Sequence, residues 1–212
     1  MSLRVYEIFF SIQGESSRIG LPTIFIRLTG CPLRCGYCDT EYAFRGGNIM
    51  SEAQILDAIR AYPTKTVCVT GGEPLAQKPC YAFLTMLADA GYQVSLETSG
   101  ALSIEEVDSR VLVVMDIKTP DSGEESKNLW SNLDHIKQQD EIKFVICSHQ
   151  DYLWSVDVIK KYKLEDKANL MFSPSYGKVN PSEIAEWMLK DGLHARLQVQ
   201  LHKVLWGEKQ GV

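Results

Sequence analysis

Three cysteines lie within one short segment of the chain, and their spacing could support metal chemistry. Cys31, Cys35 and Cys38 are separated by three and by two residues, in the pattern C-x3-C-x2-C. Thiolates on one loop can hold three irons of a 4Fe-4S cluster and leave the fourth iron open to an outside ligand, whereas ligation by four cysteines closes every iron. This crowding favours a metal centre or catalysis over disulfides.

A zinc site completed by a fourth ligand elsewhere is the alternative for this loop. Two glycines and a proline among the cysteines support a cluster, because they let the backbone wrap closely around it. The remaining cysteines lie in apolar strands or at the start of a helix; they are Cys68, Cys80 and Cys147. We expect these three to be core residues.

The chain must position this loop, and short β-branched runs alternate with longer amphipathic runs along it. The runs predict strands over residues 23–28, 66–70, 93–97, 111–117, 142–147, 170–172 and 195–199. They predict helices over residues 52–61, 80–90, 152–162 and 181–189. Repeated strand–helix units are typical of a parallel sheet in an α/β fold.

The number of strands decides between the architectures that such units allow. Six or seven strands are too few for a closed eight-unit barrel of ~250 residues. We therefore expect one domain over residues 1–212, built as an open partial (β/α) barrel with about six parallel strands. Functional loops should follow the C-terminal ends of the strands. Residues 119–133 are polar and predict a loop with one helical turn.

Composition excludes several classes of function. The 212 residues carry 22 Lys and Arg against 27 Asp and Glu, a net charge of −5. We expect no nucleic-acid partner, because general nucleic-acid binders need a basic surface. No run reaches the ~18 apolar residues of a membrane span, and the N-terminal segment lacks the apolar core of a secretory signal. These features predict no membrane association and a cytoplasmic location, where thiols stay reduced.

Further polar motifs follow the predicted strands. Thr70-Gly-Gly-Glu-Pro74 comes directly after one strand; its glycines expose backbone carbonyls, and Glu73 adds acceptor capacity for an ammonium group. Glu97-Thr-Ser-Gly100 and Asp116-Ile-Lys118 follow two later strands. The N-terminal segment reads Ile8-Phe-Phe-Ser-Ile-Gln13-Gly14-Glu15, and the C-terminal segment contains Leu201-His202-Lys203.

The sequence resembles the radical S-adenosylmethionine (SAM) superfamily. The resemblance rests on the cysteine loop, on Tyr37 before its last cysteine and on the Gly-Gly-Glu-Pro motif. Four features narrow this resemblance to the 7-carboxy-7-deazaguanine synthase family. They are the N-terminal segment, the C-terminal segment, and the motifs Phe25-Ile-Arg27-Leu and Cys-Asp39-Thr40. The resemblance implies a radical SAM lyase of 7-deazapurine (queuosine) biosynthesis. Such an enzyme converts 6-carboxy-5,6,7,8-tetrahydropterin to 7-carboxy-7-deazaguanine with loss of ammonia. It also implies a 4Fe-4S cluster, SAM and Mg²⁺, an electron donor such as flavodoxin, and a homodimer.

The resemblance also implies roles for individual residues. Cys31, Cys35 and Cys38 would ligate the cluster, and Thr40 would hold Mg²⁺. The residues expected to contact SAM are Tyr37, Cys38, Asp39, Gly72, Thr98, Ser99, Asp116, Ile117, Lys118, Ser173, Pro174, Ser175 and Tyr176. Those expected to contact the pterin are Ile12, Gln13, Gly14, Glu15, Arg27, Thr70 and His202. A glutamine suits an aminopyrimidinone because it donates and accepts, and an arginine fork suits a carboxylate.

Simpler structural roles exist for some of these residues. Arg27 could form an ion pair on an edge strand, Thr40 could cap a local turn, and residues 173–176 could form an ordinary proline turn. Two other functions also compete with the lyase. One is a glycyl-radical activating enzyme that acts on a protein partner, and the other is a zinc-binding interaction module without catalysis.

Overall fold

The fold is built on one curved, open sheet. The computed structural model describes residues 1–207, 209 and 211, and these residues form a nine-stranded sheet in the order β3-β1-β2-β4-β5-β6-β7-β8-β9. The strands are β1 (Ser2–Ile12), β2 (Pro22–Leu28), β3 (Asn48–Ser51), β4 (Thr66–Gly71), β5 (Gln93–Thr98), β6 (Leu112–Ile117), β7 (Glu141–Ile146), β8 (Asn169–Pro174) and β9 (Arg196–Leu197). Neighbours from β2 to β9 pair in parallel, whereas β1 is antiparallel to β2 and β3. The predicted open (β/α) architecture is confirmed.

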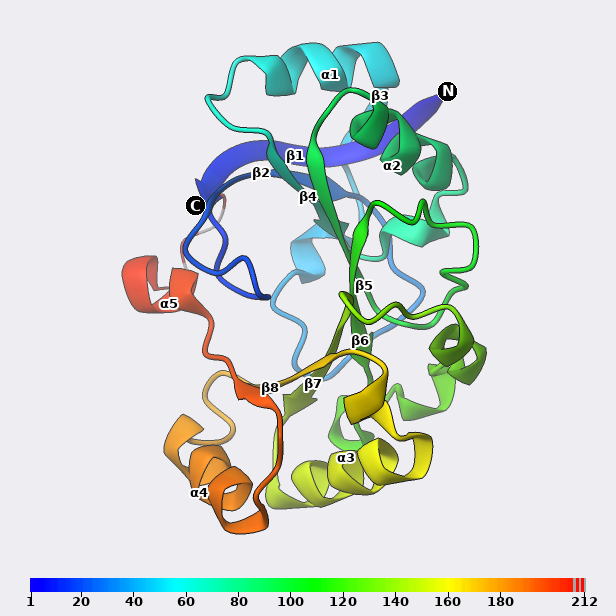
Figure 1. The fold of residues 1–212 in the computed structure, drawn as a ribbon. Coiled ribbons are helices and arrows are strands. Elements are labelled where there is room, and N and C mark those ends of the chain that lie inside the picture. Colours follow the sequence, from blue (N-terminus) through cyan, green and yellow to red (C-terminus); the bar gives the residue numbers. More distant parts are fainter. Residues whose placement is uncertain (208, 210, 212) are drawn as a thin grey trace.

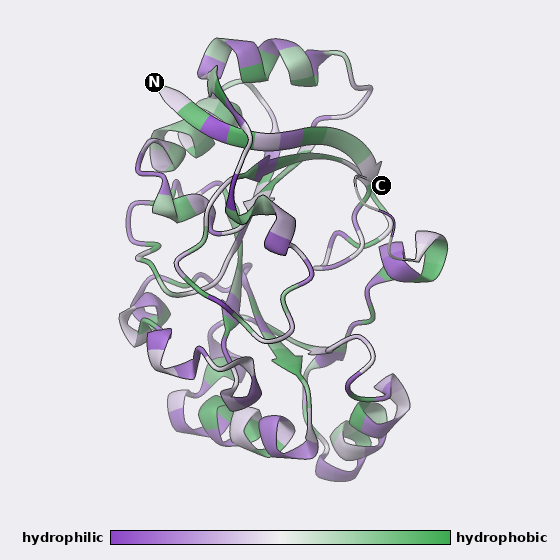
Figure 2. Cartoon of the chain, turned by 180° about the vertical axis from the view of Figure 1, so that it is seen from behind, coloured by the Kyte–Doolittle hydropathy of each residue, from purple (hydrophilic) through white to green (hydrophobic). Residues whose placement is uncertain are grey.

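Helices cover the outside of the curve, and Figure 1 shows α5 beside its open side. The helices are α1 (Glu52–Arg60), α2 (Pro79–Asp89), α3 (His149–Tyr162), α4 (Pro181–Asp191) and α5 (Leu201–Trp206). Ser51 and Asn180 form capping boxes that begin α1 and α4, as S/T/N-x-x-E/Q sequences predict. Hydrophobic and hydrophilic residues alternate on the helix ribbons in Figure 2, which is typical of helices packed against a sheet on one side. No helix in the described part of the chain is long and apolar enough to cross a membrane.

Residues 119–133 differ from the expected loop with a single helical turn. This region contains three 3-10 turns, η3 (Pro120–Ser122), η4 (Glu125–Lys127) and η5 (Trp130–Asp134). Gly123 ends the first of them with a φ of +76°, a conformation that glycine adopts without strain. The other 3-10 turns are η1 (Glu41–Phe44), η2 (Pro74–Ala76) and η6 (Leu164–Asp166).

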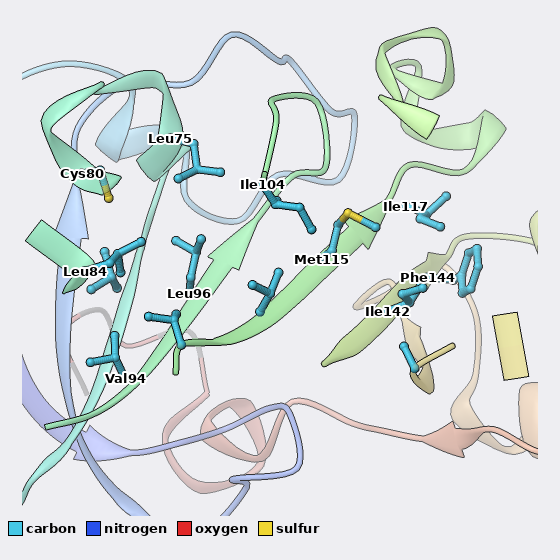
Figure 3. Packing of buried hydrophobic residues seen from close by; sticks show 14 of the residues in the cluster. Leu75, Cys80, Leu84, Val94, Leu96, Ile104, Met115, Ile117, Ile142 and Phe144 are labelled. Carbon is cyan, nitrogen blue, oxygen red and sulfur yellow. The ribbon is translucent and has the colours of Figure 1, made fainter. Parts of the chain in front are cut away.

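The hydrophobic core lies between the outer face of the sheet and the helices. Figure 3 shows Cys80 and Leu84 of α2 beside Val94 and Leu96 of β5, and all four side chains are buried. The fully buried Cys80 is a core residue, as predicted. Side chains alternate between the two faces of a strand. The residues between the core positions must therefore face the inside of the curve.

The N-terminal strand pair was not predicted. Polar residues interrupt β1, and β3 has only four residues, so neither shows a clear alternating pattern. The predicted strand over residues 195–199 is shortened to Arg196–Leu197; the next residue, Gln198, still donates its backbone N–H to Phe172 O of β8 (2.9 Å), and its side chain contacts another loop. A tertiary partner decides each of these cases, and local sequence does not reveal the partner.

The loop between β1 and β2 bridges the open side of the sheet. Ser16 N donates to Gln198 Oε1 (2.7 Å), and Gln198 Nε2 donates back to Ser16 O (2.8 Å). Ser17 N donates to Glu141 Oε1 of β7 (2.9 Å). Glu141 and Gln198 are buried, where hydrogen bonds to polar groups are most needed. The loop is thereby fixed to distant strands and places residues 12–15 over the inside of the curve.

Candidate active site

A cavity of about 660 Å³ lies inside the curve, at the C-terminal ends of the parallel strands. Its wall is formed by inward-facing strand residues, which are Thr70, Glu97, Val114, Asp116, Lys143, Val145 and Ser173. Their outward-facing neighbours pack in the core; examples are Val69, Leu96, Met115 and Phe144. The two-residue period of the strands thus separates an apolar outer face from a polar inner face.

The predicted site residues converge on this cavity, and all of them line it except Ile117. Ile117 is buried in the hydrophobic core, on the outer face of β6 between the inward-facing Asp116 and Lys118. Its side chain therefore points away from the cavity, and a contact between Ile117 and SAM could involve only its backbone. Cavity residues that sequence analysis did not assign include Glu97, Lys143, Gln200 and Lys203. Lys143 had a recognisable signal, as the one charged residue of the predicted strand 142–147.

The cysteine loop presents three free thiols to the cavity. Cys31, Cys35 and Cys38 are half-buried and unbridged. Leu33 N donates to Cys31 Sγ (3.4 Å), a type of contact that tunes ligating sulfurs in iron–sulfur proteins. Burial raises the pKa of the Cys35 thiol to about 11 and raises the pKa values of the other two thiols as well. The loop therefore needs a bound cationic centre to hold thiolates at neutral pH.

The spacing of these thiols fits a cluster better than a single ion. Within residues 1–207, 209 and 211, no three Cys, His, Asp or Glu side chains are close enough together to hold one metal ion. Zinc requires its ligands at 2.0–2.3 Å from one centre, whereas a 4Fe-4S cluster takes each thiolate at a different iron. The donor set therefore matches a cluster with one open iron.

The Gly-Gly-Glu-Pro motif brings the end of β4 against the cysteine loop. Glu73 N donates to Gly30 O (2.7 Å). A Cβ on Gly72 would collide with Gly30 O and would lie 2.9 Å from Cys31 Cβ. A residue without a side chain is therefore required at position 72 for this approach.

Glu73 does not have the role that the sequence suggested. Its carboxylate is fully buried and accepts hydrogen bonds from Leu75 N (2.9 Å), Thr98 Oγ1 (2.9 Å) and Ser99 N (2.6 Å). A buried carboxylate needs such partners, and these donors occupy its oxygens. Glu73 therefore fixes Thr98 and Ser99 at the cavity wall, and the expectation that it accepts an ammonium group is wrong.

Polar atoms near the cysteines lack protein partners. Asp116 Oδ2 pairs with Lys118 Nζ at 2.7 Å, but Asp116 Oδ1 and Tyr37 Oη are buried without a hydrogen-bond partner among the described residues. Burial raises the pKa of the Tyr37 hydroxyl, and Asp116 raises it further, so this group stays a donor. Unpaired buried polar groups indicate a place where a ligand completes the bonding. We call Cys31, Cys35, Cys38, Tyr37 and Asp116 the cysteine region.

A second group of cavity residues carries paired charges. Arg27 Nε donates to Glu7 Oε1 (2.8 Å), and Lys143 Nζ donates to Glu15 Oε2 (2.8 Å). Glu97 accepts from Thr70 Oγ1 (3.0 Å) and from Gln13 Nε2 (3.4 Å). We call Gln13, Glu15, Arg27, Glu97 and Lys143 the charged region.

Arg27 lies on an interior strand, not on an edge strand. β2 is flanked by β1 and β4, and the Arg27 side chain is 15% exposed. Burial lowers the pKa of the Arg27 guanidinium, but Tyr42, Glu7 and Glu97 outweigh burial and raise it. Arg27 therefore forms an ion pair, but on an interior strand and not on the edge strand of the alternative interpretation, and it faces the cavity with a permanent positive charge.

The C-terminal segment connects the two regions at the rim of the cavity. Gln200 Nε2 donates to Glu15 Oε1 (2.7 Å) and to Asp39 Oδ2 (3.2 Å). Lys203 Nζ lies 3.5 Å from the same Asp39 oxygen. Burial raises the pKa of Glu15, but Lys143 and the hydrogen bonds outweigh burial, so the pKa lies below its ordinary value. This network keeps Glu15 and Asp39 ionised at the mouth of the cavity.

The remaining predicted residues also occupy the rim. Leu201 N donates to Gly14 O (3.0 Å), and a Cβ on Gly14 would collide with the His202 ring, so His202 packs directly on the Gln-Gly-Glu segment. The Thr40 side chain makes no capping bond to the turn that follows it; its hydroxyl donates to Asp39 Oδ1 (2.9 Å). Ser173 and Pro174 are the last residues of β8, a turn begins at Tyr176, and residues 173–176 all line the cavity.

Comparison with known proteins defines the family. The family model of the radical SAM superfamily matches residues 25–189. A 7-carboxy-7-deazaguanine synthase from Chlorobaculum tepidum is 42% identical over 207 residues, which cover 96% of this chain and 94% of the relative. One from Koribacter versatilis is 40% identical over 226 residues, which cover 99% of this chain and all of the relative.

The chain belongs to the 7-carboxy-7-deazaguanine synthase family. A crystal structure of QueE from Escherichia coli has a TM-score of 0.80 at 22% identity and covers 95% of both chains. That likeness shows that the two chains share the open α/β fold. Membership in the 7-carboxy-7-deazaguanine synthase family disfavours the glycyl-radical activating enzyme and, with the spacing of the thiols, the zinc-binding module.

Proposed function

We propose that this protein converts 6-carboxy-5,6,7,8-tetrahydropterin to 7-carboxy-7-deazaguanine and ammonia, as a step of 7-deazapurine (queuosine) biosynthesis. The reaction removes hydrogen from C6, contracts the pyrazine ring and releases a ring nitrogen as ammonia. Product and ammonia together contain the same atoms as the substrate, so the conversion needs no external oxidant. The many curated relatives named 7-carboxy-7-deazaguanine synthase support this assignment.

The observation that carries the proposal is the presence of both regions in one cavity. Free thiols and unpaired polar atoms form the cysteine region, and Arg27, Glu97 and Gln13 form part of the charged region. An activating enzyme for a protein substrate needs an open groove, whereas Gln200 and Lys203 contact Asp39 at the rim of this cavity and narrow its mouth. Its recognition groups suit a small anionic heterocycle.

The cysteine region is proposed to hold the cofactors. Cys31, Cys35 and Cys38 would each ligate one iron of a 4Fe-4S cluster, and Tyr37, Asp116 and Lys118 would contact SAM beside it. When bound, the cluster supplies the electron that cleaves SAM, and the resulting 5′-deoxyadenosyl radical can take a hydrogen atom from an unactivated carbon. The chain's own contribution is binding, orientation and exclusion of solvent.

The charged region is proposed to orient the pterin. Gln13 and Glu97 offer an amide and a carboxylate side by side, which match the donors and acceptors of an aminopyrimidinone. Arg27 presents a planar cation that can bind a carboxylate through two N–H groups. Gln13, Glu97 and Arg27 are held by hydrogen bonds within the protein, so little reorganisation of these side chains is needed when substrate binds.

Mg²⁺ at Thr40 is a further proposal. Thr40 and Asp39 bring a hydroxyl and a carboxylate to the cavity wall, and Mg²⁺ prefers oxygen ligands while keeping several waters. This donor set fits an ion completed by substrate and water. An electron donor such as flavodoxin and a homodimeric assembly are proposals that rest on the resemblance to the family alone.

Anaerobic reconstitution tests the function. Protein loaded with iron and sulfide is reduced and mixed with SAM and 6-carboxytetrahydropterin, and mass spectrometry then measures 7-carboxy-7-deazaguanine. We expect this product and an equal amount of ammonia. If the reconstituted protein cleaves SAM but neither binds nor consumes the pterin, the proposed function is wrong and the activating-enzyme function gains support.

A further inference from the structure

A β-bulge in β1 places Glu7 against Arg27. The register pairs Val5 with Leu28, and the next pair is Glu7 with Arg27, so Tyr6 is an extra residue on β1. Val5 and Leu28 belong to the hydrophobic core. In a regular strand Glu7 would share the face of Val5, but one extra residue moves every later side chain to the opposite face. Phe9 and Phe25, the inward-facing pair that follows, line the cavity, which agrees with this shift.

The bulge gives Glu7 access to one specific atom of Arg27. Glu7 Oε1 accepts the Nε–H at 2.8 Å and also accepts the Tyr42 hydroxyl at 3.3 Å. A guanidinium has five N–H donors, of which Nε carries one and the two Nη atoms carry four. Among the hydrogen bonds of the described residues, those of Arg27 involve Nε and no Nη atom. The edge formed by both Nη atoms is thereby left for another partner.

Two aromatic rings restrain the plane of the same guanidinium. The Arg27 Cζ atom lies 5.8 Å from the Phe9 ring centroid and 5.7 Å from the Tyr42 ring centroid. Such cation–π contacts favour a charged, planar group near the rings. Hydrogen bonding at Nε and ring contacts together restrain both the direction and the tilt of the fork.

We propose that Glu7 is a positioning residue, which holds Arg27 so that its Nη edge faces the carboxylate of the bound substrate. This inference rests on the proposed function, because it assumes a carboxylated substrate. Glu7 also reduces the net positive charge beside the substrate. Its benefit must therefore come from geometry, because a two-bond fork binds only when its plane and its edge are aligned with the carboxylate.

Three ligand-binding measurements separate positioning from general stabilisation. The variants are Glu7→Leu, which removes the acceptor, and Glu7→Gln, whose amide oxygen still accepts from Nε. Glu186→Leu on the exposed face of α4 is the matched control. Each folded variant is titrated with 6-carboxytetrahydropterin, with tetrahydropterin that lacks the carboxylate, and with SAM.

We expect Glu7→Leu to bind the carboxylated pterin about tenfold more weakly, and Glu7→Gln to lose at most about threefold. Binding of tetrahydropterin and SAM should match the wild type, and the control should behave as wild type throughout. In an Arg27→Ala background, Glu7→Leu should have no further effect, because the two residues act as one unit.

Several results would overturn the inference. Equal losses for both pterins would show a structural role for Glu7, and an unchanged affinity of Glu7→Leu would show that Arg27 needs no positioning. Additive losses in the Arg27→Ala background would show that Glu7 acts independently of Arg27. If the wild type itself fails to bind the carboxylated pterin, the proposed function fails, and this inference fails with it.

Discussion

The cysteine region and the charged region line the same cavity but differ in how their polar groups are paired. In the cysteine region, Tyr37 Oη and Asp116 Oδ1 are buried without a partner among the described residues. In the charged region, Arg27 contacts Glu7 and Lys143 contacts Glu15. The first region leaves buried polar atoms without any partner, whereas in the second each of these cations has an anionic partner and the Nη edge of Arg27 is left for substrate.

This difference follows from the cost of burial. An unpaired buried polar group destabilises the protein by about 1–3 kcal/mol. A cofactor that supplies hydrogen-bond partners in the cysteine region removes this destabilisation when it binds. Buried charges cost far more when unpaired, so the charged region needs its internal partners at all times. The comparison predicts that substitutions in the cysteine region remove cofactor chemistry, whereas those in the charged region mainly weaken substrate binding.

The largest effect is expected at the cysteines. Cys35→Ala should abolish SAM cleavage, because a site with three ligands cannot lose one, and 5′-deoxyadenosine measured by chromatography should fall to background. Cys80→Ala is the matched control in the core; it should keep SAM cleavage and cost about 1–2 kcal/mol of stability. Cleavage at the wild-type rate by reconstituted Cys35→Ala would remove this cysteine from the cluster site.

The next effect is expected at Arg27. Arg27→Ala should weaken binding of 6-carboxytetrahydropterin by roughly 100-fold, because two charge-assisted hydrogen bonds are lost. Arg27→Lys keeps the charge but loses the fork, so it should also be impaired. Calorimetric titration measures both, and SAM binding and iron content serve as controls. Wild-type affinity in Arg27→Ala would place the carboxylate elsewhere.

A smaller effect is expected at Thr40. Added Mg²⁺ should raise turnover of the wild type, and Thr40→Val should lose that response, because the methyl group that replaces the hydroxyl cannot ligate a hard cation. Iron content should not change. Identical Mg²⁺ titration curves for the two proteins would contradict a role for Thr40 in metal binding.

The smallest effect concerns pH and Glu15. The folded-state pKa of Glu15 lies below its ordinary value of 4.5, so the ionised form stabilises the folded protein. This contribution is complete above about pH 4.5 and is lost as the pH falls through the lower, folded-state pKa. The melting temperature of Glu15→Gln should therefore fall less steeply than that of the wild type below this pH. Parallel curves would show that the Lys143 pair does not depress the pKa of Glu15.

The sequence was sufficient where local pattern decides structure. Apolar runs located the parallel strands, and because such strands end at one edge, the polar residues after them converge at one cavity. The cysteine spacing and the Gln-Gly-Glu segment indicated the family before any geometry was known. These features depend on neighbours along the chain.

Long-range contacts decided the remainder. The bulge at Tyr6 reverses the facing of Glu7, and no local pattern marks it. Glu73 appeared free to accept a ligand, yet Thr98 at the end of β5 and the following Ser99 donate to its oxygens. Ile117 is a different case, because it follows an inward-facing aspartate in the same strand and the two-residue period alone places it on the opposite face.

One measurement tests most directly whether SAM bound in the cysteine region takes hydrogen from the pterin bound in the charged region. The reconstituted protein is incubated with SAM and with substrate deuterated at C6, and mass spectrometry locates the deuterium. We predict deuterium in the 5′-deoxyadenosyl group, recovered as 5′-deoxyadenosine or as SAM. The carbon of 7-carboxy-7-deazaguanine that derives from C6, which carries the carboxylate, should contain none. Product formed without any deuterium in the deoxyadenosyl group would contradict the account.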